Sequence, residues 1–239
     1  KKKMDKKKYL QNLISAREKK LSKDEKTFLA EREVKTIFFL LKNFYKYSLE
    51  KSKNNNFKVL DLGCGDKFIK QPLNNLNCDY SGYDIEDLDL DKDELPDDNE
   101  SVDIVISLGL IEALKNPGHL ISESHRVLKK GGFIYLITPN WKKDYKNFYN
   151  NFYHKTPFTP ESLETALKLN GFNDVKTFPG LRCKPKWYYT GPFRFEKAFY
   201  LLPFSGNNFL NYNERKINRS WIPEFLKGHA RSIIAIAKK

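Results

Sequence analysis

A glycine pair and one aspartate are the residues whose types and spacing most suggest chemistry. Residues 59–67 read VLDLGCGDK, so Gly63 and Gly65 follow an apolar run that is typical of a buried strand. Glycines there can turn sharply and let a ligand approach the backbone, and exposed amides suit a phosphate or carboxylate. Asp84 follows Gly65 by nineteen residues, the spacing at which a strand-end carboxylate accepts hydrogen bonds from both ribose hydroxyls. These residues predict a site for a ligand with a ribose and an anionic group.

The absence of a third glycine argues against a dinucleotide ligand. The dinucleotide motif G-x-G-x-x-G would place that glycine at position 68, which is Phe68 here. NAD and FAD are therefore disfavoured. A nicotinamide oxidoreductase stays open as an alternative class, because it would use the same crevice at the ends of the strands.

Strands and helices alternate along the chain in an order that would position these residues. Apolar runs predict strands at about 57–62, 80–84, 102–108, 133–139, 175–178 and 231–237. Strands that are apolar on both faces indicate a mostly parallel sheet covered by helices. Such sheets bind ligands at the carboxyl ends of their strands, where Gly63 and Asp84 stand.

Helix signals fill the intervals between the strands. Residues 117–132 predict a helix that stops at Gly-Gly, and residues 159–172 predict one with Thr159 as its N-cap. An earlier amphipathic helix is predicted to pack on the sheet, and its apolar residues at helical spacing are Ile37, Leu40, Leu41, Phe44 and Tyr45.

The order of motifs along the chain resembles one family. VLDLGCG, the strand-end Asp84, DELPDDNESVDIV, IEA, RVLKKGG and TPN follow one another as in the class I S-adenosylmethionine-dependent methyltransferases. The resemblance covers roughly residues 34–178. It departs at Lys67, where the family has a third glycine, and at Ala113, where the family often has a histidine. It implies a Rossmann-like α/β fold with a seven-stranded, mostly parallel sheet and helices on both faces.

The resemblance also implies contacts with S-adenosylmethionine as cofactor. Asp61, Gly63 and Gly65 would form the loop around its methionine part, and Cys64 would contribute its backbone. Asp84 would hold the ribose hydroxyls.

Further along the chain, the resemblance assigns residues to the adenine and to the far side of the cofactor. Ile85 would lie against the adenine, and Asp91 would contact its amino group, with Asp89 as the alternative if the register slips by two residues. Ser107 and Leu108 end a strand where the cofactor would meet the substrate.

Methyl transfer from a sulfonium is an in-line displacement, and positioning alone can supply about 7–11 kcal/mol of its acceleration. An acceptor hydroxyl still benefits from a base, and histidine titrates near neutrality. His154 is the first candidate because it lies in the loop after strand 133–139, on the substrate side of the sheet. Glu112, just past strand 102–108, is the second candidate. Asn140 and Trp141 are predicted to line the acceptor pocket.

An aromatic-rich segment, residues 182–228, interrupts the sheet before its last strand. It holds about twelve aromatic residues among basic ones. Four interpretations stay open: a lid over a sugar or aromatic acceptor, a dimer surface, an amphipathic segment lying on a membrane, and a small satellite core that shields the sheet edge.

The substrate class is the least determined prediction. The chain lacks both the Asn-Pro-Pro-aromatic motif of adenine-amino and glutamine methylators and the Pro-Cys motif of cytosine C5 methylators. The resemblance favours O-methylation of a sugar, a glycan precursor or another small molecule. An RNA methyltransferase and a catalytically inactive protein that binds S-adenosylmethionine stay open as alternatives.

Charge and composition set the domain prediction. The formal net charge is +13, and residues 1–55 hold seventeen Lys plus Arg against seven Asp plus Glu. This basic surplus predicts a solvated tail and helical extension over residues 1–52, followed by a methyltransferase domain over 53–239. Lys1–Lys3 precede Met4 and carry no functional prediction.

The three cysteines and the hydropathy pattern indicate the cellular compartment and the relation to a membrane. Cys64, Cys78 and Cys183 lack metal-ligand spacing, so no metal site is predicted, and their odd number favours a reducing, cytoplasmic compartment. No apolar run approaches the roughly eighteen residues that a membrane span needs. Peripheral membrane contact stays open, and the sequence predicts no oligomeric state.

Overall fold

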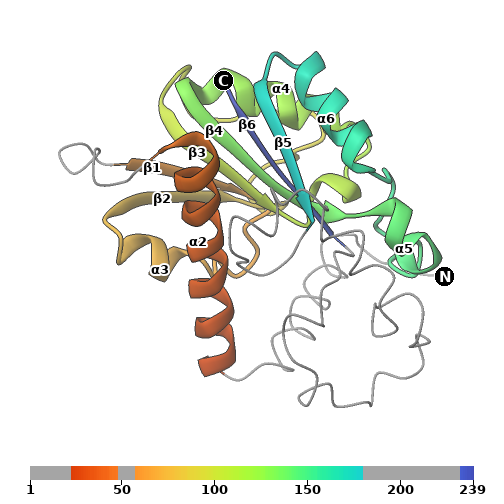
Figure 1. Cartoon of the computed structure of the whole chain (residues 1–239), viewed down its shortest axis with the longest axis horizontal. Coiled ribbons are helices and arrows are strands. Elements are labelled where there is room, and N and C mark those ends of the chain that lie inside the picture. The colour runs from red at the N-terminus through yellow and green to blue at the C-terminus, as the bar shows by residue number, and fades with distance from the viewer. Residues whose placement is uncertain (1–22, 48–56, 180–231) are drawn as a thin grey trace.

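A six-stranded sheet with the order β2-β1-β3-β4-β6-β5 organises the molecule (Figure 1). The computed structural model describes residues 23–47, 57–179 and 232–239. The strands are β1 (Phe57–Leu62), β2 (Cys78–Tyr83), β3 (Val102–Leu108), β4 (Leu128–Pro139), β5 (Asn173–Pro179) and β6 (Ser232–Lys238). The pairs β1–β2, β1–β3 and β3–β4 are parallel, and β6 is antiparallel to both β4 and β5. The predicted α/β sheet is confirmed as mostly parallel; seven strands were expected, and the described residues hold six.

Helices cover both faces of this sheet (Figure 1). They are α2 (Lys23–Tyr45), α3 (Lys70–Asn74), α4 (Pro117–Val127), α5 (Trp141–Phe148) and α6 (Pro160–Leu169), with a short 3₁₀ turn, η2 (Ile111–Ala113). Helices α2 and α3 pack on one face, and α4 and α6 pack on the other. The helices thus leave the carboxyl ends of the parallel strands to the connecting loops.

Successive side chains of the strands enter two separate cores. In β1, Val59 packs toward α2 while Leu60 packs toward α4 and α6, and both are fully buried. Ile37 and Leu41 of α2 are also fully buried, as the helical spacing predicted. Burial on both faces explains why these strands are apolar at nearly every position.

The chain reverses direction across the sheet at β1. After β2 it crosses to the other side of β1 to form β3, so β1 has β2 on one side and β3 on the other. This is the switch point of a doubly wound sheet, where the loops that follow adjacent strands diverge and leave a crevice. The candidate site is therefore expected beyond Leu62 and Leu108.

The two largest departures from the sequence-based expectation concern β4 and α5, whereas the ends of β2, β5, β6 and α6 differ by one to three residues. Strand β4 begins at Leu128, because Leu128 already pairs with Val102 of β3 before an irregularity in the register. The residues that were expected to end a helix therefore belong to the sheet. Helix α5 occupies a segment that was expected to be a loop; its sequence WKKDYKNF is short and rich in polar residues, and Asp144 interrupts its helical torsions.

Part of the domain prediction lies outside the described residues. This holds for the segment 182–228 and for the boundary at residues 52 and 53. Among the described helices, none is both long and apolar enough to cross a membrane.

Replacing Thr159 by alanine is expected to lower the free energy of unfolding by about 1 kcal/mol. Thr159 Oγ1 accepts from the Ser162 amide at 3.2 Å, and Ser162 Oγ accepts from the Thr159 amide at 2.8 Å, so the N-cap of α6 is a reciprocal capping box. Urea denaturation would measure the loss. Thr165→Ala, inside the same helix, is the matched control and should be neutral or slightly stabilising; equal losses for the two variants would contradict the role of the cap.

Candidate active site

The loop after β1 is tied to the end of β2. The Gly63 amide donates to the Tyr83 carbonyl at 2.8 Å, and the Gly65 amide donates to Asp84 Oδ2 at 2.8 Å. Asp84 Oδ1 accepts from the Ile85 amide at 2.6 Å. Gly65 and Asp84, which the sequence placed nineteen residues apart, thus come together beyond adjacent strand ends.

Gly63 meets a close neighbour that the sequence analysis did not identify. Its φ is +75°, and a Cβ at this position would stand 2.9 Å from Leu110 Cβ. The glycine is therefore required by its backbone torsion and by the packing of Leu110. Lys67, at the family's third glycine position, has a φ of +56° and so adopts the left-handed conformation that glycine favours.

Asp61 is buried beneath this loop and has one phenolic partner. The carboxylate is 2% exposed and accepts a hydrogen bond from Tyr80 Oη at 2.8 Å. Burial raises the pKa of Asp61 to about 7, although the bond from Tyr80 opposes the shift. Burial, with Asp61 and Asp84 nearby, also raises the pKa of the Cys64 thiol to about 12. Cys64 therefore stays protonated at neutral pH.

Three further predicted cofactor residues have structural partners. The buried Ser107 Oγ donates to the Leu62 carbonyl at 2.9 Å and so joins the ends of β3 and β1. Asp91 Oδ1 accepts from the amides of Lys115 and Asn116 at 2.6 and 2.9 Å. Asp91 thus holds the chain just before α4. Leu108 is half-buried in the core on the side of α2.

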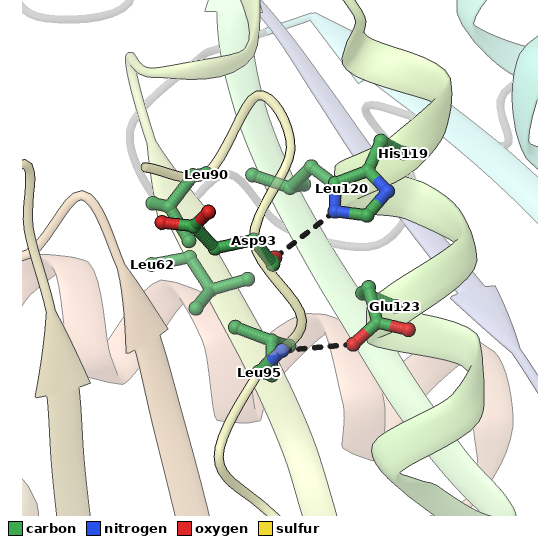
Figure 2. A pocket seen from close by; sticks show the side chains of 7 residues that line it. All are labelled: Leu62, Leu90, Asp93, Leu95, His119, Leu120 and Glu123. Atoms are coloured by element: carbon green, nitrogen blue, oxygen red, sulfur yellow. Dashed lines mark hydrogen bonds between the residues drawn. The ribbon is translucent and has the colours of Figure 1, made fainter. Parts of the chain in front are cut away.

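A narrow recess lies beside Leu62, between α4 and the segment that carries Asp91. Figure 2 shows its lining, which comprises Leu62, Leu90, Asp93, Leu95, His119, Leu120 and Glu123. Glu123 Oε2 accepts from the Leu95 amide at 2.8 Å, and His119 Nε2 lies 3.0 Å from the Asp93 carbonyl oxygen (Figure 2). The recess does not admit even a water molecule. The two contacts across the recess therefore hold the segment that carries Asp91 on α4, and the recess itself is not a ligand pocket.

Glu112 and His154, the two candidate bases, meet beyond the ends of β3 and β4. His154 Nε2 lies 3.8 Å from Glu112 Oε1. Glu112 is 3% exposed, and its Oε2 accepts from Thr138 Oγ1 at 3.0 Å. Burial raises the pKa of Glu112 to about 7. The sequence pattern indicates Glu112 and His154 as candidates but not Thr138, because a threonine inside an apolar strand carries no signal of its own.

The loop that carries His154 is docked on η2 by its backbone. The amides of Lys155 and Thr156 donate to the Glu112 carbonyl at 2.7 and 3.0 Å, and Thr156 Oγ1 donates to the Leu114 carbonyl at 2.9 Å. His154 Nδ1 lies 2.8 Å from the Phe148 carbonyl at the end of α5. Burial lowers the pKa of His154, while the Phe148 carbonyl and the Asp144 carboxylate oppose that shift.

Helix α5 carries an aromatic cluster next to this loop. Asn140 is its N-cap, with Oδ1 accepting from the Lys142 amide at 3.1 Å, and Trp141 contacts Tyr145, Phe148 and Tyr149 in edge-on geometry. Three rings of the region are exposed to solvent: Tyr145 at 53%, Tyr149 at 60% and Phe152 at 84%. Asn140 and Trp141 thus support the loop, and their contact with an acceptor stays a prediction.

The predicted cofactor residues fit a nucleoside ligand with an amino-acid tail. The amides of Gly63, Cys64 and Gly65 donate to the Tyr83 carbonyl and to Asp84, so the turn offers a ligand close approach through its two glycines. The Asp84 carboxylate stands beside the turn as an acceptor for hydroxyls. Ile85, half-buried, adds an apolar surface beside Asp84. Within the described residues, no group of three or more His, Cys, Asp and Glu side chains is arranged to hold a metal ion.

Comparison with known proteins gives a consistent picture. Residues 14–177 match a family described as a methyltransferase domain. A ubiquinone biosynthesis O-methyltransferase of Pelagibacter ubique is 24% identical over 119 residues, which cover 42% of this chain and 49% of that protein. The 2-methyl-6-phytyl-1,4-hydroquinone methyltransferase 1 of Oryza sativa is 30% identical over 155 residues, 56% of this chain and 46% of that protein. The chain thus spans about half the length of these curated relatives.

A solved structure shares the fold. The phosphoethanolamine N-methyltransferase 2 of Haemonchus contortus, in complex with S-adenosylhomocysteine and phosphomonomethylethanolamine, superposes with a TM-score of 0.51. The sequence identity is 15%, and the match covers 84% of this chain and 51% of that chain. At this identity the likeness shows the α/β fold alone.

Proposed function

Because this chain belongs to the class I S-adenosylmethionine-dependent methyltransferases, we propose that it transfers the methyl group of that cofactor to a hydroxyl of a small molecule. The contact between Glu112 and His154, at 3.8 Å, is the observation that carries the proposal of an oxygen acceptor. A hydroxyl must lose its proton as it is methylated, and a carboxylate beside an imidazole provides a base where the acceptor would enter.

The cofactor residues keep the roles that the family resemblance gave them. We assign the loop Asp61–Gly65 to the methionine part, Asp84 to the ribose hydroxyls, and Ile85 and Asp91 to the adenine, with Ser107 and Leu108 near the methyl group. When bound, S-adenosylmethionine supplies a methyl group activated by its sulfonium. The protein must then orient the acceptor, exclude water and receive one proton. We place the methyltransferase domain at residues 53–239.

Two classes of small molecule are candidates for the methyl acceptor. The sequence resemblance favours a hydroxyl of a sugar or glycan precursor. The exposed rings of Tyr145, Tyr149 and Phe152, next to the loop of His154, favour a second class: a phenolic hydroxyl on a molecule with an apolar tail. The name of one curated relative mentions O-methylation in ubiquinone biosynthesis and that of another a phytyl hydroquinone, and both support an aromatic acceptor.

Calorimetry followed by label transfer tests the proposed function. Titration with S-adenosylmethionine and S-adenosylhomocysteine is expected to give dissociation constants on the order of micromolar, with no binding of NAD. Methyl-tritiated cofactor is then incubated with a panel that contains a catechol, a p-hydroquinone, methyl glycosides and total RNA. Label on a catechol, hydroquinone or glycoside supports the proposal. Binding without transfer would indicate a cofactor-binding protein, label on RNA would favour the nucleic-acid alternative, and no binding would overturn the cofactor assignment.

Replacing Phe152 by serine is expected to raise KM about tenfold for a hydroquinone with a prenyl tail, and to leave KM for the tailless compound unchanged. The side chain is 84% exposed, and lost contact with a tail would remove roughly 1–1.5 kcal/mol. Initial-rate kinetics with both acceptors measure the difference. Leu169→Ser, at an 82% exposed position at the end of α6, is the matched control. Equal KM changes for the two acceptors would argue against the second class.

A further inference from the structure

We propose that Glu112 is the catalytic base that contacts the acceptor hydroxyl, and that His154 is a positioning residue that receives the proton from Glu112 without touching the acceptor. This inference rests on the proposed function and deepens it. It also reverses the order of the two candidates, since the sequence alone placed His154 first.

Both ring nitrogens of His154 are already directed at protein groups. Nδ1 lies 2.8 Å from the Phe148 carbonyl oxygen, which can only accept, so Nδ1 carries a hydrogen. Nε2, which then has the lone pair in the neutral ring, faces Glu112 Oε1 at 3.8 Å. The Glu112 carboxylate therefore stands beside this lone pair and competes with an acceptor hydroxyl for the space in front of it. The geometry therefore makes His154 a partner of Glu112 and a poor direct base for the acceptor.

Glu112 has one oxygen fixed by the fold and one facing a gap left by a glycine. Oε2 accepts from Thr138 Oγ1 at 3.0 Å, which holds the carboxylate against the end of β4. Oε1 lies 3.6 Å from the point where a Cβ on Gly109 would stand. Gly109 is exposed and directly follows β3, with a φ of +76°. No side chain of residue 109 therefore stands between Oε1 and the carboxyl end of β3, the side on which the cofactor is assigned.

The pair also offers the proton a route to water. The side chain of Glu112 is 4% exposed and that of His154 is 16% exposed, so the imidazole is the member nearer to solvent. Besides Glu112, the Asp144 carboxylate on α5 acts on His154, and its charge favours the protonated ring. Glu112 is flanked by Thr138 on β4 and by His154 on the docked loop.

In the proposed step, proton transfer to Glu112 accompanies methyl transfer to the acceptor oxygen. The acceptor O–H bond breaks and its proton moves to Glu112 Oε1, while the acceptor oxygen forms a bond to the methyl carbon. The methyl–sulfur bond breaks at the same time, and its electron pair stays on sulfur. Glu112 then gives the proton to His154 Nε2, and the imidazolium releases a proton to water. The carboxylate and the neutral ring are thereby restored for the next cycle.

Kinetics of paired variants test which of the two residues acts as the base on the acceptor. With the acceptor of the panel that the wild-type protein methylates, Glu112→Gln is expected to lower kcat about 10²–10⁴-fold, with the dissociation constant of S-adenosylhomocysteine unchanged within about threefold. His154→Gln is expected to lower kcat less, by about tenfold, and to shift the pH dependence of kcat. Glu33→Gln is the matched control, because Glu33 is a second carboxylate whose pKa is raised by burial. It accepts a hydrogen bond from Tyr135 Oη at 2.9 Å and lies away from the site.

Nuclear magnetic resonance titration of the imidazoles gives a readout that needs no acceptor. The His154 signal is identified by its loss in His154→Gln. Glu112→Gln is expected to lower the pKa of His154 and to leave its Nδ1–H tautomer in place, whereas Glu33→Gln should change neither. An unchanged His154 titration in Glu112→Gln would overturn the coupling of the pair.

The outcomes separate this inference from the function on which it rests. An active wild-type protein whose Glu112→Gln variant keeps its rate, or whose His154→Gln variant loses as much as Glu112→Gln, would overturn the inference alone. A wild-type protein that binds the cofactor but labels no acceptor would overturn the proposed function, and the inference with it. A folded Glu112→Asp variant that is more active than Glu112→Gln would support a base at this position.

Discussion

Replacing Asp84 by alanine is expected to weaken the binding of S-adenosylmethionine and S-adenosylhomocysteine at least a hundredfold. The carboxylate is assigned to two ribose hydroxyls, and hydrogen bonds to a charged group are worth about 1.5–3 kcal/mol each. Asp84 Oδ2 also accepts from the Gly65 amide at 2.8 Å, so its loss would release the loop that is assigned to the methionine part. Calorimetric titration measures the change directly.

Two further variants make this result interpretable. Asp79→Ala removes an exposed aspartate near the start of the same strand, β2, and should leave the affinity unchanged. Asp84→Asn keeps an oxygen that can accept from Gly65 and is expected to lose less affinity than Asp84→Ala. If Asp84→Ala bound the cofactor within threefold of the wild-type protein, the ribose assignment would have to be abandoned.

Replacing Asp61 by asparagine is expected to stabilise the fold at pH 8 while it weakens cofactor binding. The folded protein holds the pKa of Asp61 at about 7, above its ordinary value of 3.8. Between these values the folded state binds the proton more tightly than the unfolded state, so the free energy of unfolding falls as pH rises. At about 1.4 kcal/mol per pKa unit, the full loss above pH 7 is on the order of 4 kcal/mol. Asparagine carries no charge to bury and can still accept from Tyr80 Oη.

Urea denaturation between pH 4 and pH 8 would measure this effect. The stability difference between Asp61→Asn and the wild-type protein should grow with pH across that window and vanish near pH 4. Asp79→Asn, on the exposed edge of β2, is the control and should show no such growth. A wild-type protein as stable as the variant at pH 8 would mean that the carboxylate is ionised without penalty.

The sequence predicted the parallel part of the sheet well because the signal there is local. Strand β3 was predicted at its observed bounds, since VDIVISL is apolar on both faces and lies between polar turns. The spacing of Gly65 and Asp84 likewise depends on one strand-helix-strand unit, whose length fixes where its two strand ends meet. Their contact in the structure agrees with that expectation, while their role toward a cofactor stays a prediction.

Features that depend on distant neighbours could not be predicted. The start of β4 is set by its pairing with Val102, and Leu110 lies over Gly63 only because two loops meet at the switch point. Tyr80 received no role from its position in a strand, yet its hydroxyl is the partner of Asp61. Glu112 and His154 were both singled out as candidate bases, but which of them faces the acceptor depends on the path of the loop after α5. Sequence patterns constrain elements more strongly than the contacts between their loops.

The position of β6 has a consequence for how the protein is made. This strand comes last among the described residues, yet it lies inside the sheet between β4 and β5. Among the described strands, β5 pairs only with β6. While the chain is being synthesised, this pairing and the pairing of β6 with β4 must wait until residues 232–238 have emerged. Open edges can pair with other chains, and joining such distant segments is slow. The described sheet therefore gains an interior strand only after both neighbours of that strand have been synthesised.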